Sequence, residues 1–194
     1  RRWKFFLFLF LSVFAPLGVR VAGQKEYGVR SCDEPYGTFI ENCLAKARHA
    51  AKETGLPAMA DDSGLCVDAL GGAPGVFSAR FAGEDGDDAA NNAKLLAELA
   101  AVPDAECTAR FVCTLVFIDE DGTESVARGT IEGSIGREPR GSEGFGYDPL
   151  FLPDEYGGMR ALAEVSQAEK NGISHRGNAL RVLKKALSQS VDER

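Results

Sequence analysis

The spacing of apolar and polar positions along the chain predicts helices alternating with strands. Apolar residues recur at a helical period over residues 38–52, which places them on one face of a helix. Thr38 and Glu41 have the spacing of a capping box at the start of this helix, and Gly55 ends it. A stretch rich in alanine and leucine predicts a second helix over residues 89–101.

The strongest strand signal is the segment at residues 110–118, which is apolar at both alternating sets of positions. This pattern predicts a central strand that is covered on both faces. Asp121-Gly122 then predicts a tight turn into a second strand at residues 124–135, so that the two strands form an antiparallel hairpin. Residues 56–60 predict a short buried strand that exits into Asp61-Asp62-Ser63-Gly64.

The remaining pattern completes a single α/β domain over residues 1–194. Residues 71–83 are rich in glycine and predict a loop. A last helix is expected from Ser174, as its N-cap, to about residue 189. At 194 residues the chain has the length of one domain or of two lobes that share a core.

The first 22 residues are the unusual part of this pattern. Four residues that include three cations precede an apolar run at residues 5–15, which imitates the basic and hydrophobic regions of a signal peptide. The run is shorter than the ~20 residues of a membrane-spanning helix. We expect it to form a buried strand or helix, and export through this segment is the alternative.

Composition restricts the function classes. The net charge is −7, from 22 Lys and Arg against 29 Asp and Glu, which opposes wrapping a nucleic acid over a broad surface. A local phosphate site is still compatible with it. The five cysteines contain no C-x-x-C pair and are odd in number, so they predict neither a zinc site nor a disulfide framework. Buried thiols in a cytoplasmic protein are the simpler expectation.

Asp61 and Asp62 are the first candidate for chemistry. Neighbouring side chains on an extended backbone point to opposite faces, so the two carboxylates are expected to do different jobs. One could bind Mg2+ through oxygen and orient or deprotonate a water molecule. A turn stabilised by an Asp side chain is the equally weighted alternative.

The first helix supplies the second set of candidates. Asn42 and Lys46 are four residues apart and share a face, whereas Glu41 is offset from Lys46 by ~140°. Glu41 is explained by the capping box and Lys46 by a solvated helix face, so a metal-binding or phosphate-binding role needs support from outside this helix.

Two further segments have the composition of a ligand site. Residues 142–149 interleave two glycines with two aromatic residues and end in an acid, which suits a loop closing on a flat heterocycle or a hairpin turn with core aromatics. In residues 169–177, His175 and Arg176 occupy the first turn of a helix, against the preference of the helix dipole. Two basic side chains placed there point to a ligand.

Four co-linear motifs together resemble the inosine/xanthosine triphosphate pyrophosphatases. They are FIENCLAKARHAA (residues 39–51), ADDSGLCVDALGGAPGVFSARFAG (60–83), GFGYDPLF (144–151) and EKNGISHRGNAL (169–180). The resemblance extends over nearly the whole chain. It implies an elongated mixed β-sheet flanked by helices, two lobes with a central cleft, and a homodimer. It also implies Mg2+-dependent hydrolysis of purine nucleoside triphosphates outside the standard set, such as ITP, dITP and XTP, to the monophosphate and pyrophosphate.

The resemblance also assigns roles to individual residues. It implies that Asp62 binds metal and accepts a proton from the attacking water, with Asp61 in support, that Glu41 is a second metal ligand, and that Lys46 contacts the phosphates. Substrate contacts are implied for Ser63, Phe145, Gly146, Tyr147, Asp148, Lys170, His175 and Arg176. In this scheme Phe145 stacks on the purine.

The implied base contacts agree with simple hydrogen-bond chemistry. Donors from His175 and Arg176 would pair with the six-position carbonyl of hypoxanthine or xanthine, but they would face the amine of adenine. An unmatched buried polar contact costs about 1 to 3 kcal/mol.

The start of the chain departs from the family pattern. Members carry a Thr/Ser-Gly-Asn-x-x-Lys loop at the triphosphate, whereas residues 4–13 read KFFLFLFLSV and the match resumes near Phe14. Residues 4–13 therefore offer neither the Asn nor the second cation expected at the phosphates. A catalytically impaired nucleotide-binding homologue is the alternative function.

Overall fold

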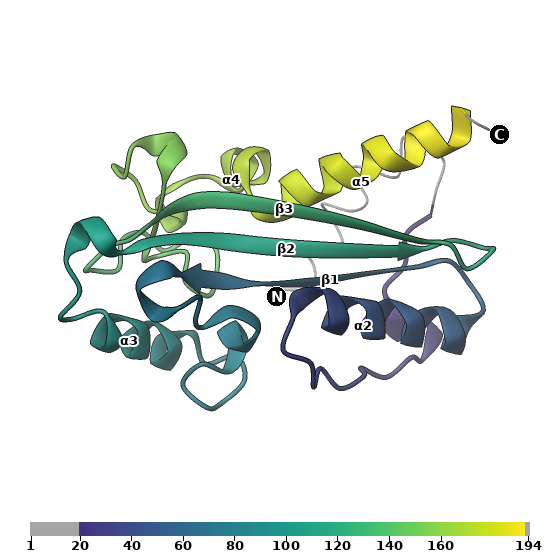
Figure 1. Ribbon diagram of the computed structural model, residues 1–194, viewed down its shortest axis with the longest axis horizontal. Coiled ribbons are helices and arrows are strands. Elements are labelled where there is room, and N and C mark those ends of the chain that lie inside the picture. The colour runs from purple at the N-terminus through teal and green to yellow at the C-terminus, as the bar shows by residue number, and fades with distance from the viewer. Residues whose placement is uncertain (1–19, 193–194) are drawn as a thin grey trace. The chain divides into compact units, whose positions relative to one another are not determined.

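The computed structural model describes residues 20–192, so the expectations for the apolar run at residues 5–15 lie outside the described part of the chain. The helices are α2 (Phe39–Thr54), α3 (Asp88–Glu98), α4 (Gln167–Ile173) and α5 (His175–Asp192), and the strands are β1 (Ala58–Val67), β2 (Thr108–Ile118), β3 (Glu124–Ile135) and β4 (Phe151–Pro153) (Figure 1). Short 3-10 turns connect them. The chain is an α/β protein, as the sequence predicts.

The strands form one four-stranded sheet in the order β1-β2-β3-β4. The predicted hairpin of β2 and β3 is confirmed, and β4 pairs antiparallel with β3. Gly133 of β3 lies opposite Pro153, and a Cβ atom at Gly133 would come within 2.3 Å of the Leu152 carbonyl oxygen. Glycine at this position therefore lets β4 approach the sheet.

The chain divides into two compact units. The first unit contains residues 20–62, 113–129 and 176–192 of the described chain, and the second unit contains residues 63–112 and 130–175. Strands β1, β2 and β3 each contribute residues to both units.

In the first unit, helices α2 and α5 cover opposite faces of the sheet (Figure 1). Alternate side chains of β2 pack against these two helices. Cys113 and Leu115 pack with Leu180 and Leu183 of α5, whereas Val116 packs with α2. The prediction of a strand covered on both faces is confirmed here, because both alternating sets of apolar side chains have a helix to pack against.

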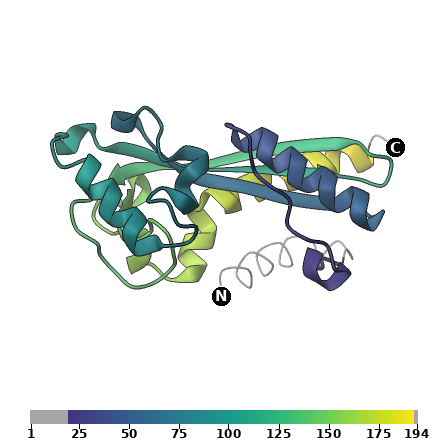
Figure 2. The same ribbon diagram turned by 90° about the horizontal axis from the view of Figure 1, so that it is seen from below.

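The second unit has its own core, in which β1, β2 and β3 pack with α3 and with the chain that follows β3. Its buried members are Leu65, Val67, Leu95, Leu99, Cys107, Ala109, Phe111, Ile131, Ile135, Tyr147, Leu150, Phe151, Leu162 and Val165. Helix α3 lies beside the turn η4 (Gly75–Arg80), where Asn91 bonds the backbone of Ala79 and Ala82 (Figure 2). The glycine-rich segment is thus an ordered loop fixed by side-chain hydrogen bonds.

Most predicted boundaries agree with the structure. Helix α2 begins after Thr38, whose hydroxyl accepts from the Glu41 amide, and it ends at Gly55 with a left-handed backbone. The helix predicted at residues 89–101 is present as α3, which ends earlier, at Glu98. Helix α5 begins directly after Ser174. Within the described residues, no helix has the length and apolarity needed to cross a membrane.

The predicted exit of a strand at Asp61-Asp62 is wrong. Strand β1 continues to Val67, so both acids lie inside the strand rather than after it. The physical reason is that Leu65 and Val67 are buried in the core of the second unit. Their burial carries the extended backbone through Ser63 and Gly64, which the sequence alone suggested as a turn.

Candidate functional site

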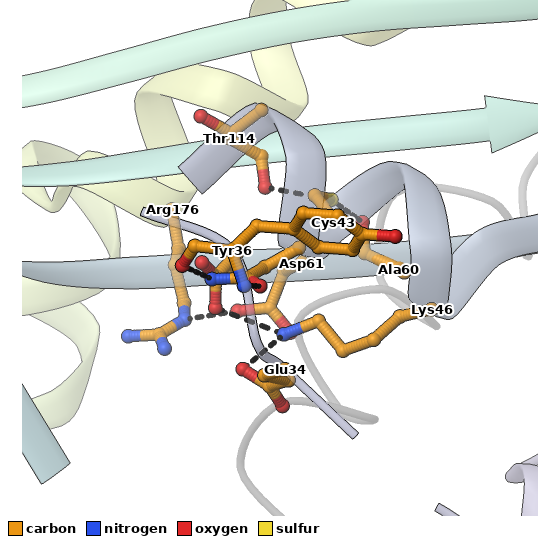
Figure 3. A network of polar contacts seen from close by, with 10 residues as sticks. Glu34, Tyr36, Cys43, Lys46, Ala60, Asp61, Thr114 and Arg176 are labelled. Atoms are coloured by element: carbon orange, nitrogen blue, oxygen red, sulfur yellow. Dashed lines mark hydrogen bonds and ion pairs between the residues drawn. The ribbon is translucent and has the colours of Figure 1, made fainter. Parts of the chain in front are cut away.

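The two adjacent acids of β1 point to opposite faces of the sheet, as the extended backbone predicts. On the α2 side, Asp62 Oδ1 accepts a hydrogen bond from Lys46 Nζ at 2.9 Å. On the α5 side, Asp61 Oδ2 accepts from Arg176 Nε at 3.0 Å (Figure 3). The first unit therefore links the Asp-Asp motif to two basic residues from two different helices.

Lys46 also contacts Glu34, a residue that sequence reasoning missed. Its Nζ atom lies 3.3 Å from Glu34 Oε2, so one ammonium group is shared by two carboxylates (Figure 3). Asn42, one turn before Lys46 on α2, is buried and bonds both the amide and the carbonyl of Tyr36 at 3.0 Å. This pair of bonds fixes the segment that carries Glu34. No sequence signal joins Glu34 to Asp62, because the two are distant in the chain.

Asp62 is a buried carboxylate with a perturbed pKa. Burial raises the pKa of Asp62 to about 6, against the opposing attraction of Lys46. Burial by itself would lower the pKa of Lys46, but the carboxylates of Asp62 and Glu34 outweigh it and raise that pKa. Near neutral pH this chemistry gives an ionised Asp62 beside a charged ammonium.

The second oxygen of Asp62 is the open position of this cluster. Among the described residues, Asp62 Oδ2 is buried and has no hydrogen-bond partner. A buried carboxylate oxygen without a donor is costly unless a ligand completes it. With the Glu34 carboxylate on the same Lys46 ammonium, the donor set is all oxygen and fits a hard divalent cation.

Glu41, the second predicted metal ligand, lies in the first turn of α2. Its Oε2 accepts from the Thr38 hydroxyl at 2.5 Å, so the carboxylate is bonded to the N-cap side chain of α2. In the part of the chain that the structure describes, no three His, Cys, Asp or Glu side chains form a ready-made metal site. The metal role of Glu41 stays a prediction.

In the second unit, the structure brings together Phe145, Asp148 and Lys170. Lys170 Nζ donates to Asp148 Oδ2 in a buried ion pair, and the same oxygen accepts from the Phe145 amide at 2.8 Å. The Lys170 ammonium lies 4.9 Å from the centroid of the Phe145 ring. Asp148 thus holds the loop at residues 142–149, called here the 142–149 loop, and leaves Phe145 half-buried.

Gly144 and Tyr147 support this loop through packing. Gly144 has φ +79°, and a Cβ atom there would come within 2.1 Å of Asp148 Oδ2, so only glycine fits. Tyr147 is buried in the core of the second unit and its hydroxyl donates to the Ser78 carbonyl at 2.9 Å. Burial raises the pKa of Tyr147, in keeping with a packed phenol. Because its side chain is packed in the core, the predicted substrate contact of Tyr147 would be made by its backbone.

The remaining predicted residues lie at the start of α5 and in β1. His175 is buried in the second unit and stacks on Phe111, with ring centroids 5.0 Å apart. Ser63 follows Asp62 directly in β1 and is partly buried. Arg176, the next residue after His175, belongs to the first unit through its bond to Asp61.

These features define an α/β protein with a buried, cation-linked acid on a central sheet and a glycine-aromatic loop. Comparison with known proteins gives the family: residues 10–186 match the model of the Ham1 family, and the chain belongs to it.

Curated relatives are similar along most of their length. A dITP/XTP pyrophosphatase of Shigella flexneri is 52% identical over 178 residues, which cover 91% of this chain and 89% of the relative. The dITP/XTP pyrophosphatase of Escherichia coli (strain K12) is 51% identical over the same length. These names agree with the resemblance that the four motifs predict.

Solved structures give the same fold. A HAM1 protein from Coxiella burnetii superposes with a TM-score of 0.85 at 44% identity, covering 92% of this chain and 91% of that one. The Staphylococcus aureus Ham1 protein has a TM-score of 0.86 at 37% identity, with 95% and 93% covered. The fold class read from the sequence is therefore confirmed.

Proposed function

We propose that this chain hydrolyses purine nucleoside triphosphates outside the standard set, such as dITP, ITP and XTP, to the monophosphate and pyrophosphate. The observation that carries the proposal is the buried Asp62, with one oxygen on Lys46 and the other without a partner among the described residues, in a member of the Ham1 family. Relatives called dITP/XTP pyrophosphatases support the choice of substrate.

In the proposed reaction, the oxygen of a water molecule attacks the α-phosphorus while the bond from that phosphorus to the α,β-bridging oxygen breaks. The nucleoside monophosphate and pyrophosphate are the products. Asp62 accepts the proton that the water loses, and its pKa near 6 suits a base that works at neutral pH. Lys46 supplies positive charge to the phosphates, which requires it to loosen its contact with Glu34.

A divalent cation, which we propose to be Mg2+, is part of this scheme. Asp62 and Glu34 would hold it, with Glu41 as the further ligand expected from the family resemblance. When bound, the cation neutralises phosphate charge and makes the attacking water more acidic. Replacing Glu34 by Gln should raise the Mg2+ concentration for half-maximal activity at least about tenfold. Glu41→Gln is the matched comparison. A larger rise in this Mg2+ concentration for Glu41→Gln than for Glu34→Gln would mean that Glu41, and not Glu34, holds the cation together with Asp62.

The second unit supplies the residues proposed for the base. Phe145 would stack on the purine, and Lys170, Asp148, His175 and the backbone near Gly146 and Tyr147 would recognise its edge, together with Arg176 and Ser63. A six-position carbonyl accepts hydrogen bonds from donors such as His175 and Arg176, whereas the amine of adenine does not. The selection of ITP over ATP follows from this difference.

The test is pyrophosphate release from a panel of ITP, dITP, XTP, ATP and GTP, with wild-type protein and Asp62→Asn. We expect release from the first three with wild type, and loss of most turnover in the variant because an amide does not accept the proton. Nucleotide binding by wild type without pyrophosphate release would support the impaired homologue instead. Equal rates for ITP and ATP would contradict the proposed specificity.

The assembly and location are proposed on the family resemblance alone. We propose that the chain acts as a homodimer, in the cytoplasm. Light scattering after size-exclusion chromatography tests the first, and a mass of about 21 kDa, that of one 20.7 kDa chain, would exclude it.

A further inference from the structure

Helix α3 contacts the middle of the 142–149 loop with two side chains that the proposed mechanism does not use. Asp88 Oδ2 accepts a hydrogen bond from the Gly146 amide at 2.8 Å. Asn92 Nδ2 donates to the Gly146 carbonyl oxygen at 2.8 Å. Asp88 and Asn92 are four residues apart and therefore share one face of the helix. Both backbone polar groups of Gly146 are thus bonded to a single helix.

The rest of the 142–149 loop is held at its ends and by the side chains of Asp148 and Tyr147. The amides of Ser142 and Glu143 donate to the Ala163 carbonyl, and the Arg140 amide donates to the Pro149 carbonyl. Between these anchors, Gly146 has φ +64° and no side chain of its own to pack. The α3 contacts therefore fix the loop where its backbone has the most freedom, next to the half-buried Phe145.

Asn92 brings both a gain and a loss of stability at this position. Its Oδ1 atom is buried and has no hydrogen-bond partner among the described residues, although Nδ2 reaches Gly146. An apolar side chain would remove this unpaired acceptor, but it would leave the Gly146 carbonyl oxygen without its donor, so the gain and the loss are of similar size. The asparagine therefore ties α3 to the loop with little net effect on stability.

We propose that Asp88 and Asn92 are positioning residues for substrate: they clamp Gly146 so that Phe145 is presented to the purine base in one fixed place. The proposal rests on the proposed function and adds α3 to the parts that determine base binding. Because the clamp occupies the amide and carbonyl of Gly146, that residue acts through the loop's shape rather than through its own backbone donor, which refines its predicted substrate contact.

The experiment compares Asp88→Ala, Asp88→Asn and Asn92→Leu with Asp87→Ala. Asp87 is the N-cap of the same helix and bonds only the Ala90 amide in this network, so its loss weakens α3 without touching Gly146. Asp88→Asn keeps an oxygen that can accept from Gly146 and serves as the conservative rescue. The two readouts are steady-state kinetics with dITP and amide hydrogen exchange in the peptide that spans residues 142–150.

Asp88→Ala should raise the KM for dITP by about 3- to 10-fold, the range expected for one net hydrogen bond, with little change in kcat. It should also speed exchange in the loop peptide, whereas Asp88→Asn and Asp87→Ala should leave both readouts near wild type. Asn92→Leu should raise KM while the free energy of unfolding changes little, because the removed acceptor and the orphaned Gly146 carbonyl offset each other.

An unchanged KM in Asp88→Ala, with or without faster exchange, would overturn the clamp as a positioning device. So would a rise in KM of the same size in Asp87→Ala, since the effect would then reflect helix stability. If wild-type protein released no pyrophosphate, the proposed function would fail, and the exchange measurement would still decide whether the clamp holds the loop.

Discussion

Asp62 combines its proposed catalytic role with a cost to the fold. Its side chain is buried, and one of its oxygens has no partner among the described residues. Lys46 compensates for only part of the burial, because the pKa of Asp62 remains raised. A buried acid whose pKa is raised by its surroundings is typical of functional sites, where stability is reduced in favour of chemistry.

This cost gives a pH-dependent stability in metal-free protein. Burial raises the native pKa of Asp62 from 3.8 to about 6, so between these values the native state binds more protons than the unfolded state. Its contribution to stability therefore falls as the pH rises through this window. Asp62→Asn should be more stable relative to wild type at pH 8 than at pH 4, as measured by denaturant unfolding in EDTA. A stability difference that is constant with pH would contradict the assignment.

Strand β2 organises the first unit because its two faces meet two different helices. Leu115 is completely buried with α5, and its neighbour Val116 is completely buried with α2. The same period-two pattern carries β1, where Asp61 and Asp62 take the places of apolar side chains on the two faces. The functional acids are therefore positioned by strand geometry rather than by a loop.

Truncation of a buried side chain on the α5 face of β2 should lower the free energy of unfolding. Leu115→Ala should lower the free energy of unfolding by about 2–5 kcal/mol, since it removes buried methyl groups and leaves a cavity. Val126→Ala on β3 is the control, because Val126 is 47% exposed and should change stability by less than about 0.5 kcal/mol. Chemical denaturation measures both, and similar losses in the two variants would contradict this assignment of the core.

At the scale of the whole molecule, the proposed substrate should stabilise the protein selectively. In Asp62→Asn, which should not turn the nucleotide over, dITP with Mg2+ at a hundred times its Kd should add about 2.7 kcal/mol to the free energy of unfolding. ATP at the same concentration should add much less, because its six-position amine does not match the proposed donors. Thermal unfolding by calorimetry measures the shift, and equal shifts for the two nucleotides would contradict base selection.

The net charge of the whole chain also affects how an anionic substrate could bind. At −7, the protein repels polyanions in general, so the proposed substrate would have to be attracted by local positive charge, for which Lys46 at the phosphates and Lys170 and Arg176 at the base are the proposed sources. Each of these three cations is paired with an acid in the structure: Lys46 with Asp62, Lys170 with Asp148 and Arg176 with Asp61. Substrate binding must therefore compete with internal ion pairs, which favours a ligand that brings its own cation.

The sequence by itself determined the elements whose signals are local. The helical period and the Thr38 cap were sufficient for α2, and the apolar run with Asp121-Gly122 was sufficient for the β2-β3 hairpin. The four motifs were likewise sufficient for the family, because residue identity in order along the chain is what a family shares. That Asp61 and Asp62 face different partners also followed from the alternation of an extended backbone.

Only the tertiary structure decided how far β1 extends and which partners its acids have. Burial of Leu65 and Val67 overrode the turn that Ser63 and Gly64 suggested, because long-range packing outweighs local propensity. Glu34 joined Lys46, and α3 joined Gly146, through contacts between residues far apart in the chain. Such contacts leave no periodic signal in a single sequence, so their physical basis becomes visible only once the backbone brings the partners together.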